Sequence, residues 1–140
     1  MSAASREIRV SAVVMRDPRG RVLNVRKRGT VMLMLPGGKH EPGENPRATA
    51  VREFSEELGI DLDVDRLDAL GVFASPAANE PGHTVVAAVF EHPFVAAAAS
   101  AVPRAEIEHL EWVDPARDRG DLAPLNTEHV FPALRARDGR

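Results

Sequence analysis

The N-terminal part of the chain alternates short apolar runs with polar turns, a pattern typical of β-strands. The run IRVSAVVM (8–15) is rich in β-branched residues, the turn sequence DPRG (17–20) follows it, and RVLNVRKR (21–28) alternates apolar and polar positions. These segments predict a β-hairpin. The run VMLMLPGG (31–38) predicts a further short strand that breaks at Pro36, because proline cannot donate to a strand ladder.

From Asn45 onward the apolar residues take helical spacing. Asn45 is placed to cap a helix, and Pro46 suits the first helical position, where a missing N–H costs nothing. Gly59 is a C-terminal stop signal, so the helix is predicted to end at about Leu58. Its apolar side, which would dock on a sheet, comprises Ala48, Ala50, Val51, Phe54 and Leu58.

Further strands are predicted in the second half of the chain, where runs of β-branched and aromatic residues lie between polar turns. They cover residues 70–74, 84–92 and 107–113. The alanine-rich connection at 95–106 is consistent with more than one conformation.

The chain closes with a predicted helix over residues 125–137, capped at Asn126. Pro132 either kinks this helix or marks a later start. Strands interleaved with one central and one terminal helix predict an α/β (α+β) domain in which helices flank a mixed β-sheet.

The composition restricts the possible functions. The 140 residues fit one domain (1–140) without a linker or repeat, with residues 1–6 expected to be flexible. A formal net charge of −3 argues against a polymeric nucleic-acid partner. The absence of cysteine excludes disulfides, zinc–thiolate sites and a cysteine nucleophile. Because no segment resembles a membrane span or a signal peptide, we expect a soluble, cytoplasmic protein without a membrane partner.

Three glutamates, Glu53, Glu56 and Glu57, share one side of the central helix. Like charges at this spacing repel, Arg52 is the only cation beside them, and two of them lie near the negative end of the helix dipole. An ordinary solvated helix face is one interpretation, and a surface that docks a basic protein is another. A cluster of carboxylate oxygens without cations is also what Mg²⁺ prefers, so a metal could supply the missing charge.

Residues 38–60 carry a longer pattern, G-x5-E-x7-R-E-U-x-E-E-x-G-U, in which U is a bulky apolar residue. This pattern resembles the signature of the MutT-like Nudix hydrolases, with Phe54 and Ile60 at the two apolar positions. All seven fixed positions are matched, by Gly38, Glu44, Arg52, Glu53, Glu56, Glu57 and Gly59. The resemblance implies an α/β/α sandwich and a hydrolase of phosphorus-containing acid anhydrides. Its substrate would be a nucleotide or a nucleoside diphosphate linked to another group.

The resemblance also implies roles for individual residues, including a bound Mg²⁺ for which Mn²⁺ could substitute. Glu56 and Glu57 would be the principal metal ligands, and Glu53 would be a further ligand or the base that orients the attacking water. Gly38 would offer its backbone carbonyl to the metal. Arg52 would contribute to catalysis by pairing with carboxylates and, together with Glu44, would hold the loop in shape.

Groups outside this pattern complete the expected site. Family members often use an additional glutamate, and the spacing to Trp112 makes Glu106 the candidate, with Glu108 as the alternative. Each of the two could equally be a solvated strand residue. The cations that could contact substrate phosphates are Arg26, Lys27, Arg28 and Lys39.

Two other expectations concern the whole protein. A non-catalytic module that binds a nucleotide or nucleotide sugar is the alternative to an enzyme, although a pure binder has no need for three metal-binding glutamates. The resemblance also allows a homodimer, because family members are often dimers.

Overall fold

The computed structural model of the chain describes residues 6–139. The expectation of a flexible segment at 1–6 therefore lies outside the described residues, except for Arg6, which begins the first strand. The strands are β1 (Arg6–Val14), β2 (Val22–Lys27), β3 (Gly37–Lys39), β4 (Asp68–Pro76), β5 (His83–Glu91) and β6 (Ile107–Val113). The α-helices are α1 (Pro46–Leu58) and α2 (Phe131–Arg137), joined by the 3₁₀ turns η1 (Val64–Arg66) and η2 (Ala96–Ser100) and the π-helical segment η3 (Asn126–Val130).

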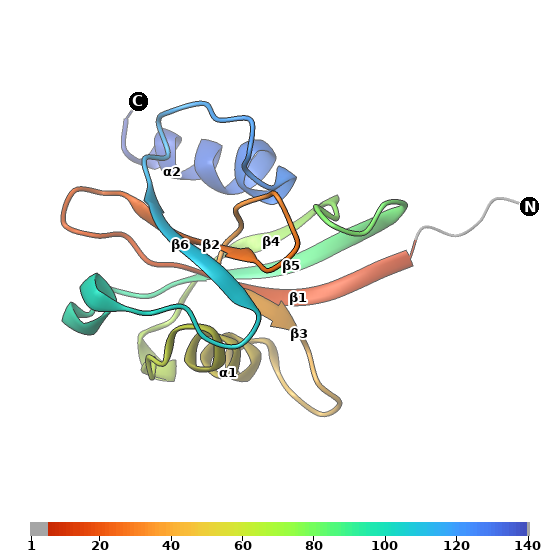
Figure 1. Cartoon of the computed structure of the whole chain (residues 1–140), viewed down its shortest axis with the longest axis horizontal. Coiled ribbons are helices and arrows are strands. Elements are labelled where there is room, and N and C mark those ends of the chain that lie inside the picture. Colours follow the sequence, from red (N-terminus) through yellow and green to blue (C-terminus); the bar gives the residue numbers. More distant parts are fainter. Residues whose placement is uncertain (1–5, 140) are drawn as a thin grey trace, which may run out of the picture.

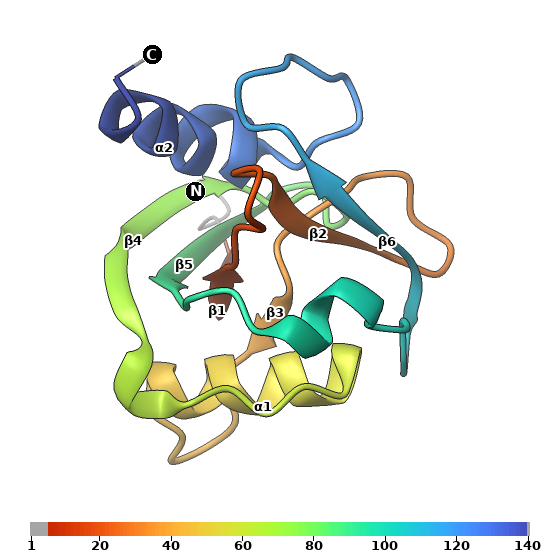
Figure 2. The same ribbon diagram turned by 90° about the vertical axis from the view of Figure 1, so that its left-hand side faces the viewer.

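The strands form two sheets between the two helices (Figure 1). A four-stranded sheet has the order β3-β1-β5-β4, in which β1 and β5 are parallel and the other pairs antiparallel. Strands β2 and β6 form a separate antiparallel pair. Figure 2 shows α1 below and α2 above these strands. The predicted mixed sheet flanked by helices is confirmed.

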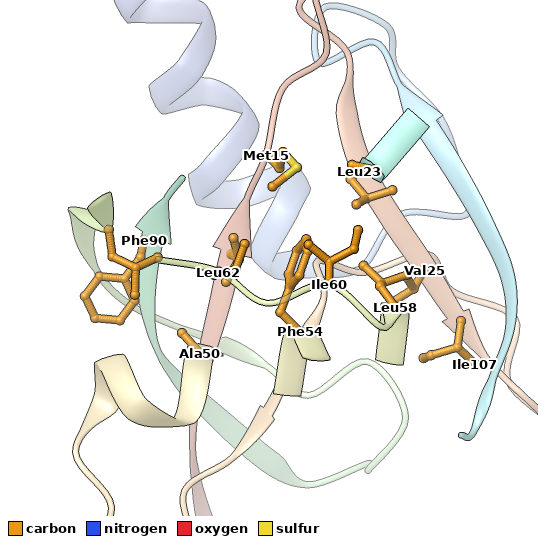
Figure 3. Packing of buried hydrophobic residues seen from close by; sticks show 13 residues of the cluster. Met15, Leu23, Val25, Ala50, Phe54, Leu58, Ile60, Leu62, Phe90 and Ile107 are labelled. Atoms are coloured by element: carbon orange, nitrogen blue, oxygen red, sulfur yellow. The ribbon is translucent and has the colours of Figure 1, made fainter. Parts of the chain in front are cut away.

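The apolar residues form a core on each side of β1. Val13 and Met15 pack toward α1 with Phe54 (Figure 3), whereas Val14 packs toward α2 with Phe131. All five side chains are at most 1% exposed. Because β1 is buried on both faces, its C-terminal half is a continuous apolar run without strict alternation.

Helix α1 begins and ends where the local signals predict. The Asn45 side chain accepts a hydrogen bond from the N–H of Ala48 at 2.8 Å, and Pro46 occupies the first helical position. Gly59 takes a left-handed conformation with φ of 68° and donates its N–H to Ser55 O. At each end, the capping residue and its hydrogen-bond partner are therefore at most four positions apart in the chain.

The predicted hairpin is wrong as a strand pair, although its turn forms. The N–H of Gly20 donates to Asp17 O at 2.8 Å, and an isolated bridge joins Arg16 to Val22. Beyond that bridge the strands diverge, β1 joining β3 and β5 while β2 joins β6. Apolar periodicity identifies a strand but carries no information about its partner.

Two further expectations need correction. The strand predicted within 31–38 is reduced to isolated bridges at Leu33 and Met34, and regular pairing begins after Pro36, in β3. Asn126 does not cap the terminal helix: it is the first residue of η3, and its side chain is buried. Pro132 lies in the first turn of α2, but the backbone before it is already helical from residue 124 through η3, so Pro132 does not mark a later start of the helical stretch. The alanine-rich connection contains η2.

Within residues 6–139, no helix has the length and apolar character needed to cross a membrane.

Candidate active site

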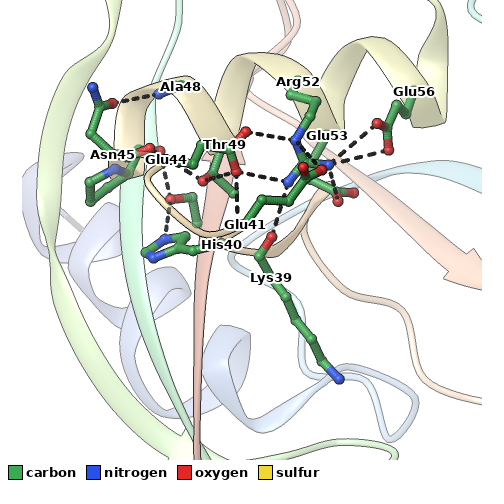
Figure 4. Close-up of polar contacts among 12 residues, drawn as sticks. Lys39, His40, Glu41, Glu44, Asn45, Ala48, Thr49, Arg52, Glu53 and Glu56 are labelled. Atoms are coloured by element: carbon green, nitrogen blue, oxygen red, sulfur yellow. Dashed lines mark hydrogen bonds and ion pairs between the residues drawn. The ribbon is translucent and has the colours of Figure 1, made fainter.

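Arg52 lies at the centre of a network of carboxylates on α1 and the preceding loop (Figure 4). Its Nε and Nη2 donate to the two oxygens of Glu44 at 2.7 and 2.9 Å, and its Nη1 donates to Glu53 Oε1 at 2.9 Å. Nη1 also lies 3.3 Å from Glu56 Oε1, and Nη2 donates to the carbonyl of Lys39 at 3.0 Å. In this structure Arg52 therefore pairs with Glu44, Glu53 and Glu56 and offsets part of their negative charge.

Glu44 joins this network to the start of the helix. The Arg52 guanidinium, followed by the Thr49 hydroxyl that donates at 2.6 Å, lowers the pKa of Glu44 to about 2. Glu44 is consequently ionised at neutral pH and holds the loop after β3 against α1.

The three glutamates have different environments, so the interpretation as an ordinary solvated helix face is wrong for Glu57. Glu57 is only 2% exposed, whereas the side chain of Glu56 is 53% exposed. Glu57 Oε1 accepts from the N–H of Gly37 at 3.0 Å, and its buried Oε2 has no hydrogen-bond partner in the described part of the chain. Burial raises the pKa of Glu57 to about 8 and also raises that of Glu53.

The two glycines of β3 allow this close approach between strand and helix. A Cβ on Gly38 would lie 2.4 Å from the carboxylate carbon of Glu53. A Cβ on Gly37 would lie 2.1 Å from the backbone oxygen of Ser11 in β1. A side chain at either position would therefore displace a neighbour, in one case a carboxylate and in the other a strand.

Of the two candidates outside the pattern, Glu106 lies near the glutamates of α1. Glu106 pairs with Lys27 at 3.2 Å, and its charge contributes to raising the pKa of Glu57. Glu108 instead pairs with Arg26 at 2.9 Å. The β2–β6 register shifts between Arg26 and Lys27, and such irregularities re-aim side chains.

A cavity of about 380 Å³ opens beside these groups. Its lining includes Glu53, Gly38, Glu106, Lys27 and Lys39. Among its lining residues in the described chain, the other two cations proposed for phosphate contact, Arg26 and Arg28, do not occur.

Sequence reasoning missed other residues that line the cavity. These lining residues come from β4, from the loop after it, and from η3, and they include Ser75, Ala77, Asn79 and Asn126. One signal in the sequence was available, since Asn24 interrupts the otherwise apolar run VLNV and, like Asn126, is buried. A buried amide requires a partner, and the partner of Asn24 is Asn126.

The donors of this site fit a divalent metal, although they are not gathered around one point. Among residues 6–139, no group of three acidic or histidine side chains is arranged to hold an ion. Glu53 and Glu56 instead form ion pairs with Arg52, and Glu106 forms one with Lys27. The unpaired buried Oε2 of Glu57 and the close approach of Gly38 to Glu53 are the features that suit a small cation with oxygen ligands.

Comparison with known proteins places these observations in a family. The family model described as NUDIX domain matches residues 5–130. A putative 8-oxo-dGTP diphosphatase of Bacillus subtilis (strain 168) is 27% identical over 105 residues, which cover 75% of this chain and 65% of that protein. The chain thus spans slightly less than two thirds of that relative.

Solved structures share the fold over nearly the full length. The MutT protein from Methanosarcina mazei Go1 is similar with a TM-score of 0.78 and 22% identity, covering 99% of this chain and 100% of that one. The MutT NUDIX hydrolase from Burkholderia pseudomallei is similar with a TM-score of 0.68 and 26% identity, covering 93% and 97%.

Proposed function

Because this chain belongs to the NUDIX domain family, we propose that it is a divalent-metal-dependent pyrophosphohydrolase. It would cleave a diphosphate bond in a nucleotide or a nucleoside diphosphate derivative, which makes it a hydrolase of phosphorus-containing acid anhydrides. The observation that carries this proposal is the cavity of about 380 Å³, whose lining combines Glu53, Glu106 and two lysines with the uncharged polar residues Ser75, Asn79 and Asn126. The charged groups suit phosphates with a metal, and the uncharged polar groups suit a base.

The metal would be held by residues that the family pattern indicates. Glu56 and Glu57 would be the principal ligands, with Glu53, the carbonyl of Gly38 and Glu106 as the further candidates. When bound, Mg²⁺ or Mn²⁺ would neutralise the diphosphate oxygens and lower the pKa of a coordinated water.

The remaining polar residues would position these groups. Arg52, anchored by Glu44, holds the Glu53 carboxylate at 2.9 Å and so directs it toward the cavity, where it could orient the attacking water. Lys27 and Lys39 line the same cavity as Glu53 and would contact substrate phosphates. Each lysine is paired with a glutamate, at 3.2 Å for Lys27 and Glu106 and at 3.8 Å for Lys39 and Glu80. Both ion pairs would have to open when phosphate binds.

Nucleoside triphosphates, including oxidised ones, are the first substrates to test. The cavity has the volume of a small-molecule site, and the Bacillus subtilis relative is named as a putative 8-oxo-dGTP diphosphatase. The predicted cytoplasmic location and the predicted homodimer stay predictions, and sedimentation velocity would test the second.

Two rival functions have less support. A non-catalytic nucleotide-binding module would not need the glutamates of α1 and Arg52 together. A surface that docks a basic protein would need exposed, uncompensated charge, yet Glu57 is buried and Glu53 and Glu56 pair with Arg52.

The test is a substrate panel with Mg²⁺ and with Mn²⁺, covering nucleoside triphosphates, oxidised nucleotides, ADP-ribose, nucleotide sugars and dinucleoside polyphosphates. We expect release of phosphate or pyrophosphate from at least one class. The nearly isosteric Glu57→Gln should abolish this activity while leaving the protein folded. Glu41→Gln is the matched control, because Glu41 also pairs with Arg52, at 3.1 Å, but has a 60% exposed side chain.

Two outcomes would contradict the proposal. If Glu57→Gln turned over substrate as fast as the wild type, the assignment of Glu57 as a metal ligand would be wrong. Binding of nucleotides without cleavage under every metal condition would identify a binding module.

A further inference from the structure

We propose that Asn24 fixes the orientation of the Asn126 side-chain amide, so that the occupant of the cavity must present a hydrogen-bond donor there. This inference rests on the proposed function, because it takes the occupant to be a nucleotide base. Asn24 is thus a positioning residue that determines specificity without touching the substrate.

Asn24 is an unusual residue for its place in the fold. It lies in the middle of β2 and is 0% exposed, as are its neighbours Val22, Leu23 and Val25. Burying an amide at such a position is costly unless its polar atoms are paired. Both polar atoms of the Asn24 side chain are hydrogen-bonded: its Nδ2 donates to Val22 O at 3.2 Å, and its Oδ1 accepts from Asn126 Nδ2 at 2.8 Å.

These two bonds set the orientation of both amides. The carbonyl of Val22 belongs to the backbone and can only accept, so Asn24 must turn its Nδ2 toward it. The Oδ1 of Asn24 then faces Asn126, which must donate a hydrogen bond from its own Nδ2. If either amide were flipped alone, two acceptors or two donors would face each other. The orientation is therefore transmitted from a backbone carbonyl of β2 to Asn126.

As a result, the Oδ1 of Asn126 takes no part in this pair of hydrogen bonds. Asn126 is 1% exposed, and its Oδ1 is a buried atom without a hydrogen-bond partner among residues 6–139. Buried polar groups are almost always paired, so this acceptor calls for a donor that the protein itself does not supply.

Two observations connect this acceptor with a ligand. Asn126 lines the cavity and begins η3, and π-helical turns occur frequently at functional sites. Ser75, which lines the same cavity, also has a buried Oγ without a partner in the described chain. A hydroxyl can donate or accept, whereas the oriented Oδ1 of Asn126 can only accept. Asn126 therefore determines which bases are preferred.

The expected ligand group is a base edge that carries a ring N–H or an exocyclic amine. An analogue with an acceptor, or with no polar group, at that point would leave the Asn126 oxygen unpaired. Losing this bond should lower kcat/KM and affinity by about tenfold or more.

The experiment compares nucleoside triphosphates in pairs of which one member carries a donor that the other lacks. The pairs are 8-oxo-dGTP with dGTP, of which only the first has an N–H at ring position 7; GTP with ITP; and ATP with purine riboside triphosphate. Both kcat/KM with Mg²⁺ and dissociation constants by calorimetry in EDTA are measured. We expect the wild type to prefer the donor-bearing member of at least one pair by about tenfold or more.

Asn24→Leu has a similar volume and removes both amide groups. In this variant Asn126 is free to turn, so the preference should fall to within about threefold, through a higher KM and dissociation constant of the preferred member, with kcat nearly unchanged. Val25→Ala is the matched control, because it loosens the same buried strand without touching either amide and should keep the preference. Asn24→Val, which suits a strand, serves if the leucine variant does not fold.

A double-mutant cycle tests whether Asn24 acts through Asn126. The variant carrying both Asn24→Leu and Asn126→Ala should discriminate no less than Asn126→Ala alone. A merely structural role of Asn24 would instead lower stability and leave the preference intact.

The possible failures can be told apart. Hydrolysis without any donor preference in the wild type, or an undiminished preference in folded Asn24→Leu, would overturn this inference and leave the proposed function standing. Nucleotide binding with the expected preference but without hydrolysis would overturn the enzyme and keep the inference. If no nucleotide binds, both are wrong.

Discussion

Replacing Gly38 by alanine should reduce catalysis strongly while leaving the fold nearly as stable as before. The new Cβ would lie 2.4 Å from the carboxylate carbon of Glu53 and 2.6 Å from both of its oxygens. An ordinary contact begins at 3.4 Å, so the carboxylate must move by about 1 Å. A displacement of this size at a catalytic group can cost about 10²-fold in rate.

The effect on stability should be small because the obstructing atoms end a side chain. Glu53 would weaken its bond with Arg52, a partly exposed ion pair of the kind that contributes less than about 1 kcal/mol. Gly37→Ala is the informative contrast. Its Cβ would lie 2.1 Å from Ser11 O and 2.8 Å from the Cα of Ala12, both in the backbone of β1. Because Ala12 is the register partner of Gly37, this strand cannot move without losing the pairing, and we expect a loss of about 3 kcal/mol or more.

The assay combines urea denaturation with Mg²⁺-dependent turnover for both variants, and Mn²⁺ affinity provides a readout that does not depend on the substrate. Gly120→Ala is the control, since no atom lies within 4 Å of its added Cβ, and it should match the wild type in each measurement. Wild-type turnover and Mn²⁺ affinity in Gly38→Ala would refute the placement of Glu53 in the site. Wild-type stability of Gly37→Ala would refute the packing of β3 against β1.

Three further predictions concern the stability of the frame that carries the site. The folded-state pKa of Glu44 is about 2, below the ordinary 4.5, so its contribution is present above about pH 4.5 and lost as the pH falls toward 2. Glu44→Gln should therefore be less stable than the wild type at pH 7, and the gap in urea midpoints should close near pH 2; a gap independent of pH would contradict this. Phe54→Ala should lower the free energy of unfolding by about 3–5 kcal/mol in urea titrations, because Phe54 is 0% exposed in the core beneath α1, and a loss below about 1 kcal/mol would refute that role. Asn45→Ala should cost about 1 kcal/mol by removing the cap to Ala48, while Asn45→Asp, which keeps the acceptor, should cost much less in the same titration.

The parts of the fold that depend on neighbouring residues were predictable. The start and end of α1 depend on Asn45, Pro46 and Gly59, which act within one helical turn, and all three lie where the sequence indicated. The five strands that apolar runs predicted, other than the one expected within 31–38, correspond to β1, β2, β4, β5 and β6. Their neighbours in the sheets were not predictable, because β1 and β5 pair residues that lie far apart in the chain, from Arg6 with His83 to Val14 with Glu91.

The candidate site divides in the same way. The family pattern identified Glu53, Glu56 and Glu57 as a set and implied different roles for them, but it carried no information about how deeply each is buried. Only the packing of β3, which begins with two glycines, against α1 buries Glu57 and leaves Glu56 exposed. Their different environments follow from contacts with residues about twenty positions away, such as the bond from Gly37 to Glu57.

The amino-acid sequence alone thus determined the family, the central helix with its caps, and the residue types available for metal and phosphate. Tertiary structure decided which carboxylates are paired and by which cations, and it brought Asn24 and Asn126 into contact across 102 positions of the chain. The physical reason is range: capping and periodicity act over a few residues, whereas burial and hydrogen bonding between distant segments exist only once the chain has folded.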